Sequence, residues 1–376
     1  MSTRIPAVFM RGGTSKGLVF LRSDLPEDRS EWDALFLSAM GSPDPYGRQL
    51  DGMGGGVSSL SKVCVVGPPS RPDADVDYTF AQVSVTGAKV DYSSNCGNMS
   101  SAIGPFSLMK GLVRADGAEV VVRIHNTNTG KVIHASFSSG ASASQEKLMD
   151  IPGVSRAGLP IRLDFLSPGG ATTGRLLPTG RECDTLAIPG IGDVEVSMVD
   201  AANACVFIDA ATLGLDGTEM PAALSERPDL LHTLETIRRH ASVAMGVTAS
   251  LEQAAERPVV PFLGIVSAPQ ASPSLAGMVV NADDVDLTVR MLANGLPHLA
   301  LPVTASLCTA VSAGLEGTLV HRHARSRTDG PLRLGMPSGV LNVEAEVTRD
   351  AQEWRALRGS FYRTARVLFD GFVHIV

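Results

Sequence analysis

The chain has 376 residues, of which 44% are hydrophobic, 19% are charged and 5% are aromatic, and its formal net charge is −7 at pH 7. This length suggests two domains, or one large one, with an ample core. The negative charge, without any basic stripe, argues against a nucleic-acid partner, although a few local cations and backbone amides would suffice to bind an anionic substrate.

Five cysteines, at positions 64, 96, 183, 205 and 308, are spread along the chain without any Cys-x-x-Cys pair. This pattern predicts no structural zinc site and fits a reducing compartment. No histidine lies at a metal-binding spacing. No segment resembles a signal peptide or a membrane span. We therefore expect a cytoplasmic protein with no membrane partner, and nothing in the sequence requires a cofactor.

The first predicted elements are strands at 5–10 and 18–21, joined by the loop Arg11–Gly17. The loop is either an ordinary hairpin turn or a cradle for a carboxylate, with backbone amides and the hydroxyl of Thr14 or Ser15 as donors. Gly13–Gly17 also matches Gly-x-Ser-x-Gly, but a nucleophile elbow needs a helix after the loop. Here a second strand is predicted instead.

Residues 28–40 predict an amphipathic helix, and the glycine- and proline-rich loop 41–56 follows it. A loop of this length inside a compact domain is typical of a functional segment. It leads to Lys62, after which the apolar run 63–66 indicates a buried strand. Desolvation at the mouth of such a strand favours the neutral amine of a lysine, which can accept a proton.

Residues 75–85 alternate as a half-buried strand does. Asn95-Cys96-Gly97-Asn98 then precedes the small, apolar segment 99–109. If Cys96 lies at a helix N-terminus, the free amides there stabilise its thiolate. Lys62 and Cys96 would then form a proton-transfer site, whereas a solvated lysine and a buried cysteine are the ordinary alternatives.

The rest of the chain predicts a solvated loop at 138–144, a domain break near 183–188, and a series of regular elements. Further strands are predicted at 120–124, 132–137, 161–165, within 194–208, and at 261–267, 340–347, 362–369 and 372–376. Helices are predicted at 226–243, 283–293 and 303–314, the second because acidic residues open its first turn.

The second half repeats the first loosely, since Ser306–Ala310 also starts a small-residue helix. Cys308 is either a second proton carrier or, with Ser306 and Thr309, a donor of backbone amides to a carboxylate at a helix N-terminus. The late turn Gly335–Gly339 either only precedes a strand or places Ser338 over a substrate carboxylate.

Four segments in the same order resemble the PrpF family: Arg11–Gly17, Gly52–Lys62, Asn95–Asn98 and Leu177–Gly180. This family includes 2-methylaconitate isomerases, 4-oxalomesaconate tautomerases and methylitaconate isomerases. The resemblance implies an α/β (α+β) fold like that of diaminopimelate epimerase, with two pseudo-symmetric halves that each wrap a sheet around a central helix. The domains would be 1–184 and 185–376, with the last strand packing back on the first domain.

The resemblance also implies a cofactor-independent isomerase that moves a C=C bond of an unsaturated di- or tricarboxylic acid by 1,3-allylic proton transfer. The 2-methylaconitate cis-trans type is preferred, and 4-oxalomesaconate tautomerase is the alternative. Lys62 and Cys96 would be catalytic, without a metal, and a homodimer is a hypothesis for the assembly. The substrate contacts would come from both halves: Gly13, Thr14, Ser15, Gly54, Gly55, Ser58, Asn95, Gly97, Asn98, Ser306, Cys308, Thr309 and Ser338.

Two other hypotheses remain open. One is a two-thiol epimerase or racemase of an amino acid that uses Cys96 and Cys308. The other is a non-catalytic partner protein that assists an aconitase-like dehydratase by binding it.

Overall fold

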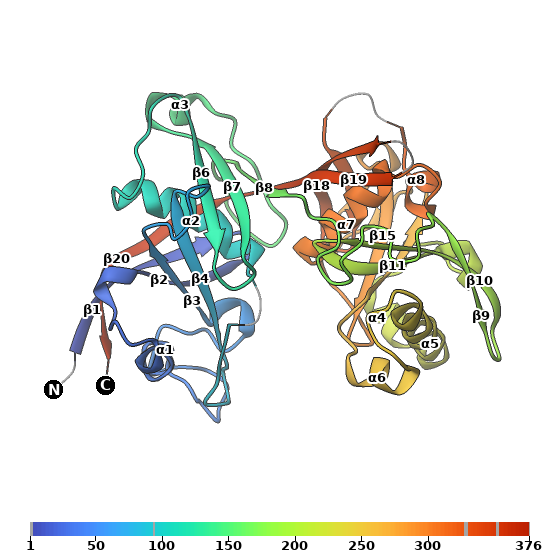
Figure 1. Ribbon diagram of the computed structural model, residues 1–376, viewed down its shortest axis with the longest axis horizontal. Helices are drawn as coiled ribbons and strands as arrows, with labels where there is room; N and C mark the ends of the chain where they lie inside the picture. The colour runs from blue at the N-terminus through green and yellow to red at the C-terminus, as the bar shows by residue number, and fades with distance from the viewer. Residues whose placement is uncertain (1–2, 93–94, 327–329, 351–352, 376) are drawn as a thin grey trace. The chain divides into compact units, whose positions relative to one another are not determined.

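The computed structural model describes residues 3–92, 95–326, 330–350 and 353–375 and divides into two compact units. Unit 1 comprises Met1–Asp164 and Tyr362–Val376, and unit 2 comprises Phe165–Phe361. Strands β8 (Ile161–Leu166) and β19 (Glu353–Arg363) run across the division (Figure 1). The sequence placed the boundary at 184/185. The segment before that position belongs to unit 2 because it bonds to a strand there, with Asp200 donating to Leu176 O and accepting from Gly170 N.

The sheet of unit 1 is mixed, with parallel pairings β2–β3 and β4–β6 and otherwise antiparallel ones. The short strand β5 (Val90–Asp91) pairs with β4. The order across the sheet is β20 (Ala365–Ile375), β1 (Thr3–Gly12), β2 (Ser15–Leu21), β3 (Lys62–Gly67), β4 (Val76–Val83), β6 (Glu119–Asn126) and β7 (Lys131–Ser138). The last strand of the chain thus lies beside the first.

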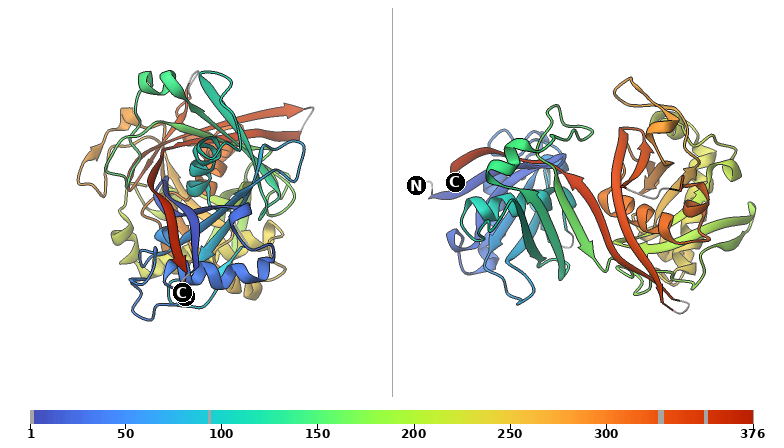
Figure 2. Two further views of the ribbon diagram at one scale, coloured as in Figure 1. Left: turned by 90° about the vertical axis from the view of Figure 1, so that its left-hand side faces the viewer. Right: turned by 90° about the horizontal axis from the view of Figure 1, so that it is seen from above.

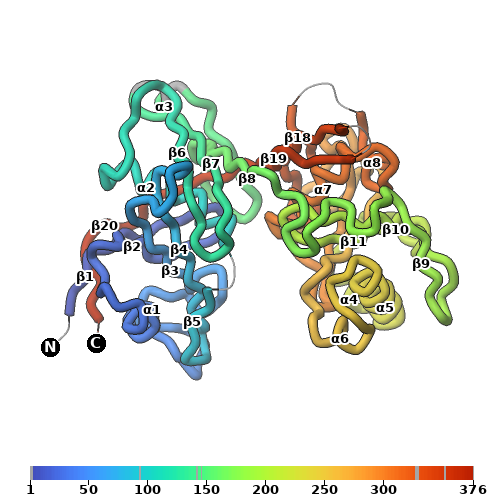
Figure 3. Tube along the Cα trace, viewed as in Figure 1, coloured from blue at the N-terminus to red at the C-terminus, as the bar shows by residue number. Residues whose placement is uncertain are grey.

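Two helices pack against the sheet of unit 1 (Figure 3). Helix α1 (Trp32–Met40) shares a core cluster with Val63 and Val65 of β3. Helix α2 (Gly97–Met109) contacts β1, β2, β3, β6, β7 and β20. Because side chains alternate along a strand, Lys62 and Cys64 lie on the face of β3 opposite to α1.

Unit 2 has a second mixed sheet (Figure 2), beside which β13 (Ser272–Pro273) and β14 (Val279–Val280) form a separate ribbon. The order across the main sheet is β9 (Asp184–Ile188), β10 (Gly192–Ala201), β11 (Asn203–Asp209), β12 (Phe262–Ser267), β15 (Leu287–Ala293), β17 (Leu332–Met336), β18 (Gly339–Asp350) and β19, with β16 (Leu296–Pro297) on β15. The helices are α4 (Pro221–Ser225), α5 (Pro228–Ala244), α6 (Leu251–Glu256), α7 (Val303–Gly314) and α8 (Leu319–His323).

The two units repeat one strand pattern. Reading from β20 to β7 and from β9 to β18, successive pairings are antiparallel, antiparallel, parallel, antiparallel, parallel and antiparallel in both. In each unit one helix, α2 or α7, contacts several strands of the sheet. In the chain, α2 lies between β4 and β6, and α7 lies between the equivalent strands β15 and β17. The expected α/β class with pseudo-symmetric halves is therefore confirmed.

Three predictions of secondary structure were wrong. The predicted helix 283–293 is a 3-10 turn followed by β15, because Leu287–Ala293 is buried throughout and pairs with β12 and β17. The predicted loop 138–144 contains the short helix α3 (Gly140–Gln145). The strands predicted at 362–369 and 372–376 are one strand, β20, since Gly371 stays paired with Ala7. The strand β19 that precedes it was missed.

The helix predicted from residue 28 begins as an α-helix only at Trp32. Asp28 instead caps a 3-10 turn, Arg29–Glu31, by accepting a hydrogen bond from Ser30 N at 2.9 Å. An acidic side chain at this place satisfies a free amide of the turn, so the regular helix starts one turn later.

Candidate functional site

Cys96 lies directly before α2, at the N-cap position, with an extended backbone. Its carbonyl accepts from Ser100 N at 2.9 Å and from Ser100 Oγ at 3.0 Å, and Asn95 Oδ1 accepts from the same hydroxyl at 3.2 Å. The first amides of a helix have no partner within it and carry a partial positive charge. The half-buried Cys96 therefore lies at the N-terminus of a helix, where the sequence placed it.

Lys62 is the first residue of β3 and is 8% exposed. Its Nζ lies 2.5 Å from Gln82 Oε1 and 5.0 Å from the ring centroid of Phe80. Gly17 is its neighbour on the parallel strand β2, and a Cβ there would lie 2.9 Å from the carbonyl carbon of Lys62. Glycine is thus required for the close approach of β2 to the lysine.

The pKa values of Cys64 and Tyr78 respond to the charges of their neighbours. Burial raises the pKa of Cys64, the charge of Cys96 raises it further, and Lys62 lowers it. Burial also raises the pKa of Tyr78, with smaller increases from Cys64 and Cys96. Cys64 and Tyr78 therefore stay neutral near pH 7.

The loop between β1 and β2 lies against the N-terminus of α2. A Cβ at Gly12 would lie 2.6 Å from Asn98 O, and Gly13 has a φ of +52°. Asn98 Nδ2 donates to Thr14 Oγ1 at 3.2 Å, and Arg11 Nη1 donates to Gly13 O at 2.8 Å. The loop that is predicted to bind a carboxylate is thus hydrogen-bonded to the segment Asn95–Asn98, which contains Cys96. Because β2 begins at Ser15, the nucleophile-elbow geometry is absent from this described loop.

Arg363 is a cation that the sequence analysis missed. It is 7% exposed, and its Nε donates to Asn98 Oδ1 at 3.1 Å while its Nη1 donates to Tyr362 O at 2.9 Å. Burial lowers its pKa to about 10, so it remains charged near neutral pH. It is separated from Asn98 by 265 residues, and no local pattern in the sequence distinguishes it from the other arginines.

The glycine-rich loop before Lys62 is held by its own hydrogen bonds. Gly54 N donates to Met40 O at 3.2 Å, and Gly56 N donates to Gln49 Oε1 at 3.0 Å. A Cβ at Gly55 would lie 2.7 Å from a side-chain carbon of Leu60. The amide of Gly54 is therefore already bonded to the last residue of α1. Ser58, at the end of this loop, is exposed.

The predicted contacts Ser306, Cys308 and Thr309 lie inside α7 rather than at its N-terminus. The helix begins at Val303, and Ser306 N already donates to Pro302 O at 2.9 Å. All three side chains are fully buried and donate to carbonyls: Ser306 to Val303 at 2.8 Å, Thr309 to Ala305 at 2.8 Å and Cys308 to Val199 at 3.4 Å. The expectation that their amides bind an anion is wrong, because only the first turn of a helix has free amides.

Ser338 lies in the turn between β17 and β18. Among the residues that the structure describes, its Oγ is one of the buried side-chain atoms without a hydrogen-bond partner. A buried hydroxyl of this kind is suited to a contact with a ligand.

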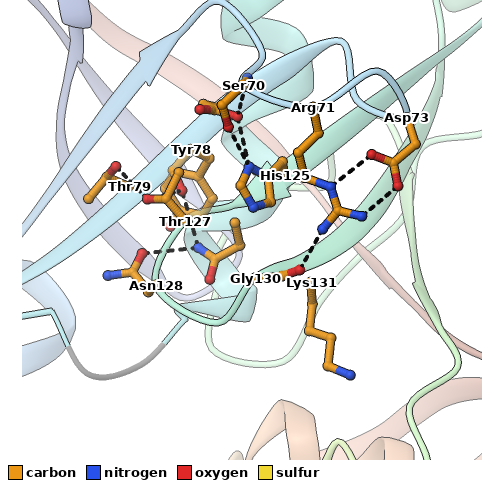
Figure 4. Close-up of polar contacts among 12 residues, drawn as sticks. Ser70, Arg71, Asp73, Tyr78, Thr79, His125, Thr127, Asn128, Gly130 and Lys131 are labelled. Atoms are coloured by element: carbon orange, nitrogen blue, oxygen red, sulfur yellow. Dashed lines mark hydrogen bonds and ion pairs between the residues drawn. The ribbon is translucent and has the colours of Figure 1, made fainter.

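The histidine region of unit 1 is a separate polar network. His125 Nδ1 lies 2.8 Å from Asp77 Oδ1 and 3.3 Å from Ser70 Oγ, and Arg71 forms an ion pair with Asp73 (Figure 4). The described residues contain no group of three His, Cys, Asp or Glu side chains that could hold a metal ion. Within the same described residues, no helix is both long enough and apolar enough to cross a membrane.

A family model described as "PrpF protein" matches residues 2–376. The chain is 39% identical to the 3-methylitaconate isomerase of Eubacterium barkeri and 38% identical to the 2-methyl-aconitate isomerase of Shewanella oneidensis, in each case over 99% of this chain and 97% of the relative. It is 36% identical to the 4-oxalomesaconate tautomerase of Pseudomonas putida, over 99% of this chain and 96% of the relative.

A solved structure gives the same picture. The crystal structure of a methylitaconate-delta-isomerase superposes with a TM-score of 0.91 at 38% sequence identity, covering 100% of this chain and 96% of that one.

Proposed function

Because the chain belongs to the PrpF family, we propose that it is a cofactor-independent isomerase of unsaturated di- or tricarboxylic acids. The reaction is a 1,3-allylic proton transfer that moves a C=C bond. The observation that carries this proposal is the placement of two groups in unit 1: Lys62 is the buried first residue of β3, and Cys96 is the N-cap residue of α2, which packs against β3.

Lys62 is the base in the proposed reaction. Its neutral amine removes an allylic proton, and the electron pair of the broken C–H bond spreads over the allyl system onto a carboxylate as a dienolate. Cys96 gives a proton to the far carbon, or to the same carbon after bond rotation, and the thiolate that forms is stabilised by the N-terminus of α2. Proton return from the lysine ammonium to the thiolate then restores both groups.

The substrate carboxylates need donors that strengthen their hold as negative charge develops. In unit 1 the α2 amides of Gly97 and Asn98, the hydroxyls of Thr14 and Ser15, and the cation of Arg363 suit this role. Gly13, Gly55, Ser58 and Asn95 are proposed to shape the same site.

The preferred substrate is 2-methylaconitate. The named activities of the relatives also make 3-methylitaconate and 4-oxalomesaconate candidates, at 39% and 36% identity respectively. All three are unsaturated polycarboxylates, so the same base, acid and carboxylate donors would serve each of them. The shape of the binding pocket decides which of these three acids is the substrate.

The two-thiol epimerase is less well supported, because Cys308 is fully buried inside α7 and its thiol donates to Val199 O. Burial raises the pKa of Cys205, and its hydrogen bond with Cys308 raises this pKa further. A non-catalytic partner protein would catalyse no exchange with any unsaturated acid.

A proton NMR time course in deuterium oxide tests the proposal. The chain is incubated separately with 2-methylaconitate, 3-methylitaconate, 4-oxalomesaconate, aconitate and diaminopimelate. We expect deuterium to enter an allylic position of one unsaturated acid, and Lys62→Met to abolish this exchange. Lys89→Met, which changes an exposed lysine, is the matched control. No exchange with any unsaturated acid would contradict the proposal and favour the partner protein, and exchange only at the α-carbon of the amino acid would favour the epimerase.

We also infer a homodimer that forms along β20. Among the described strands, β20 pairs with β1 on one edge, and Val367, Leu368 and Phe369 are between 41% and 45% exposed. Antiparallel pairing of two copies centred on Leu368, where the register with β1 shifts, would set Val367 opposite Phe369. It would also set Arg366 opposite Asp370, whose carboxylate pairs with Lys110 within the chain at 3.0 Å. Light scattering should find a monomer for Arg366→Asp and a dimer again when Asp370→Arg is added.

The location that we propose for the protein is the cytoplasm, in line with five cysteines that are all free thiols in the structure. The net charge of −7 gives no support to a nucleic-acid partner and is compatible with a small anionic substrate that is held by local cations.

A further inference from the structure

Lys62 and Gln82 lie directly opposite each other on the antiparallel strands β3 and β4. Their side chains therefore share one face of the sheet, and Lys62 Nζ donates to Gln82 Oε1 at 2.5 Å. Gln82 is thus in contact with the amine that the proposed function makes the base.

The carboxamide of Gln82 has only one orientation that fits its neighbours. Its Nε2 donates to Ser58 O at 3.0 Å and to Ser61 O at 2.9 Å. A carboxamide has two N–H donors on nitrogen and only acceptors on oxygen. A flipped amide would set oxygen against both carbonyls and its NH₂ group against the lysine. The two serine carbonyls therefore determine that Oε1 faces Lys62.

From this geometry we propose that Gln82 is the positioning residue of the catalytic amine, an inference that rests on the proposed function of Lys62. Oε1 is an acceptor only, so it takes one N–H of the lysine whether the amine is neutral or protonated. The remaining positions on Nζ, including the lone pair of the neutral amine, are directed away from Gln82. A neutral amide also holds the lysine side chain without favouring its protonated form, whereas a carboxylate in the same place would favour the ammonium.

Gln82 also joins the lysine to the loop before it. Ser58 and Ser61 both belong to the segment that ends at Lys62, and Ser61 Oγ accepts from Gln49 Nε2 at 2.7 Å. Gln49 in turn accepts from Gly56 N at 3.0 Å. Two glutamine amides therefore hold the residues between the glycine-rich loop and the amine, so that a shift of this loop would be transmitted to Nζ.

The charged and titratable groups around this pair are few. Asp91 pairs with Gln82 from β5, and Lys16 of β2 lies over the ring of Phe9, which belongs to the α1 core cluster. Cys64, Tyr78 and Cys96 are coupled electrostatically on this side, and Lys62 acts on Cys64. Arg363 contacts Asn98 at the N-terminus of α2. A carboxylate introduced at position 82 would add a negative charge in direct contact with Nζ.

The test compares kcat and KM against pH for the wild type, Gln82→Glu and Gln82→Met. If Lys62 must be neutral, kcat rises with pH along an acidic limb. Gln82→Glu should move that limb up by about one to two pH units, because an opposite charge in contact favours the ammonium. The rate at pH 7 then falls about ten- to hundredfold and recovers at higher pH, while KM stays within about twofold. Gln82→Met should lower kcat without moving the limb upward.

A second measurement follows the titration of the Lys62 amine and needs no turnover. The chain has six lysines, so carbon-13 labelling of lysine gives a simple spectrum in which Lys62→Met identifies the signal of Lys62. Its titration midpoint should rise in Gln82→Glu relative to the wild type. An unchanged midpoint in a folded Gln82→Glu variant overturns the proposal. A raised midpoint in a chain that turns over no unsaturated acid would support the Gln82–Lys62 contact and refute the proposed function alone.

Discussion

Cys96 and Pro302 occupy equivalent positions in the two units, because each is the N-cap residue of the helix that precedes the sixth strand of its sheet. This strand is β6 in unit 1 and β17 in unit 2, and each pairs in parallel with the fifth strand. Lys62 begins β3, and the equivalent strand of unit 2, β12, begins with Phe262. The repeated scaffold therefore places an amine and a thiol at these two positions in unit 1, and a phenylalanine and a proline in unit 2. Cys308 lies further along α7, inside the helix.

The two cysteines should differ sharply in their effect on activity. Cys96→Ser should lower the rate of allylic exchange by at least about a hundredfold, since it removes a proton carrier. Cys308→Ala should keep most of the activity, because this thiol is fully buried and bonded to Val199 O. Deuterium exchange by NMR measures both. Loss of exchange in a folded Cys308→Ala variant would instead revive the two-thiol epimerase.

Gly13 should tolerate no side chain. Its φ is +52°, and a Cβ would lie 3.1 Å from Arg363 Cδ and against the carboxamide of Asn98. Gly13→Ala should therefore raise KM about tenfold by displacing Asn98, beyond the roughly 1–2 kcal/mol of backbone strain. Gly47→Ala is the matched control, because Gly47 has a φ of +66° and nothing within 4 Å of its Cβ position. Equal KM values in the two variants would count against a role for this loop in binding.

Arg363 should matter for binding through its shape as well as its charge. Arg363→Lys keeps a cation but loses the planar donor group that bonds to Asn98. We expect KM to rise about tenfold, with a smaller change in kcat, because the carboxylate donors would be displaced while the proton carriers remain. Arg355→Lys, at a position 61% exposed in its side chain, is the control. Unchanged KM for Arg363→Lys would remove this residue from the site.

The ion pair of Glu235 and Arg238 in α5 should make stability depend on acidic pH. Burial raises the pKa of Glu235, but hydrogen bonds from Arg238 and Arg239 outweigh it and hold the pKa below its usual 4.5. With the folded pKa lowered, the stabilisation is fully present above pH 4.5 and is lost as pH falls through the folded pKa. Glu235→Gln should cost about 1–3 kcal/mol at pH 7, and this difference should shrink at acidic pH.

Urea unfolding of the wild type and Glu235→Gln from pH 7 downward measures that difference. Glu226→Gln, at an exposed position just before the helix, is the control and should show little change at any pH. A Glu235→Gln deficit that stays constant down to the lowest pH at which the chain folds would show that the carboxylate charge is not the source of the stabilisation.

Local patterns in the sequence were sufficient for much of unit 1. The apolar run after Lys62 predicted β3, and the small residues after Cys96 predicted a helix, because burial repeats with the period of each element. Such patterns indicate which residues of a regular element are buried. Both α2 and α7 begin and end within two residues of their predicted bounds. The same reasoning failed at Leu287–Ala293, where burial on both faces and pairing with β12 and β17 outweighed the acidic turn before it.

What the sequence indicated by itself is most of the elements, the family and two candidates for the proton carriers, because these depend on residues close together in the chain. The tertiary structure decided which distant residues complete the site. Gln82 reaches Lys62 only through the register of β3 and β4, and Arg363 reaches Asn98 only because the last strands return to unit 1. Strand register is selected by packing across the whole sheet, so no local pattern could have predicted either contact.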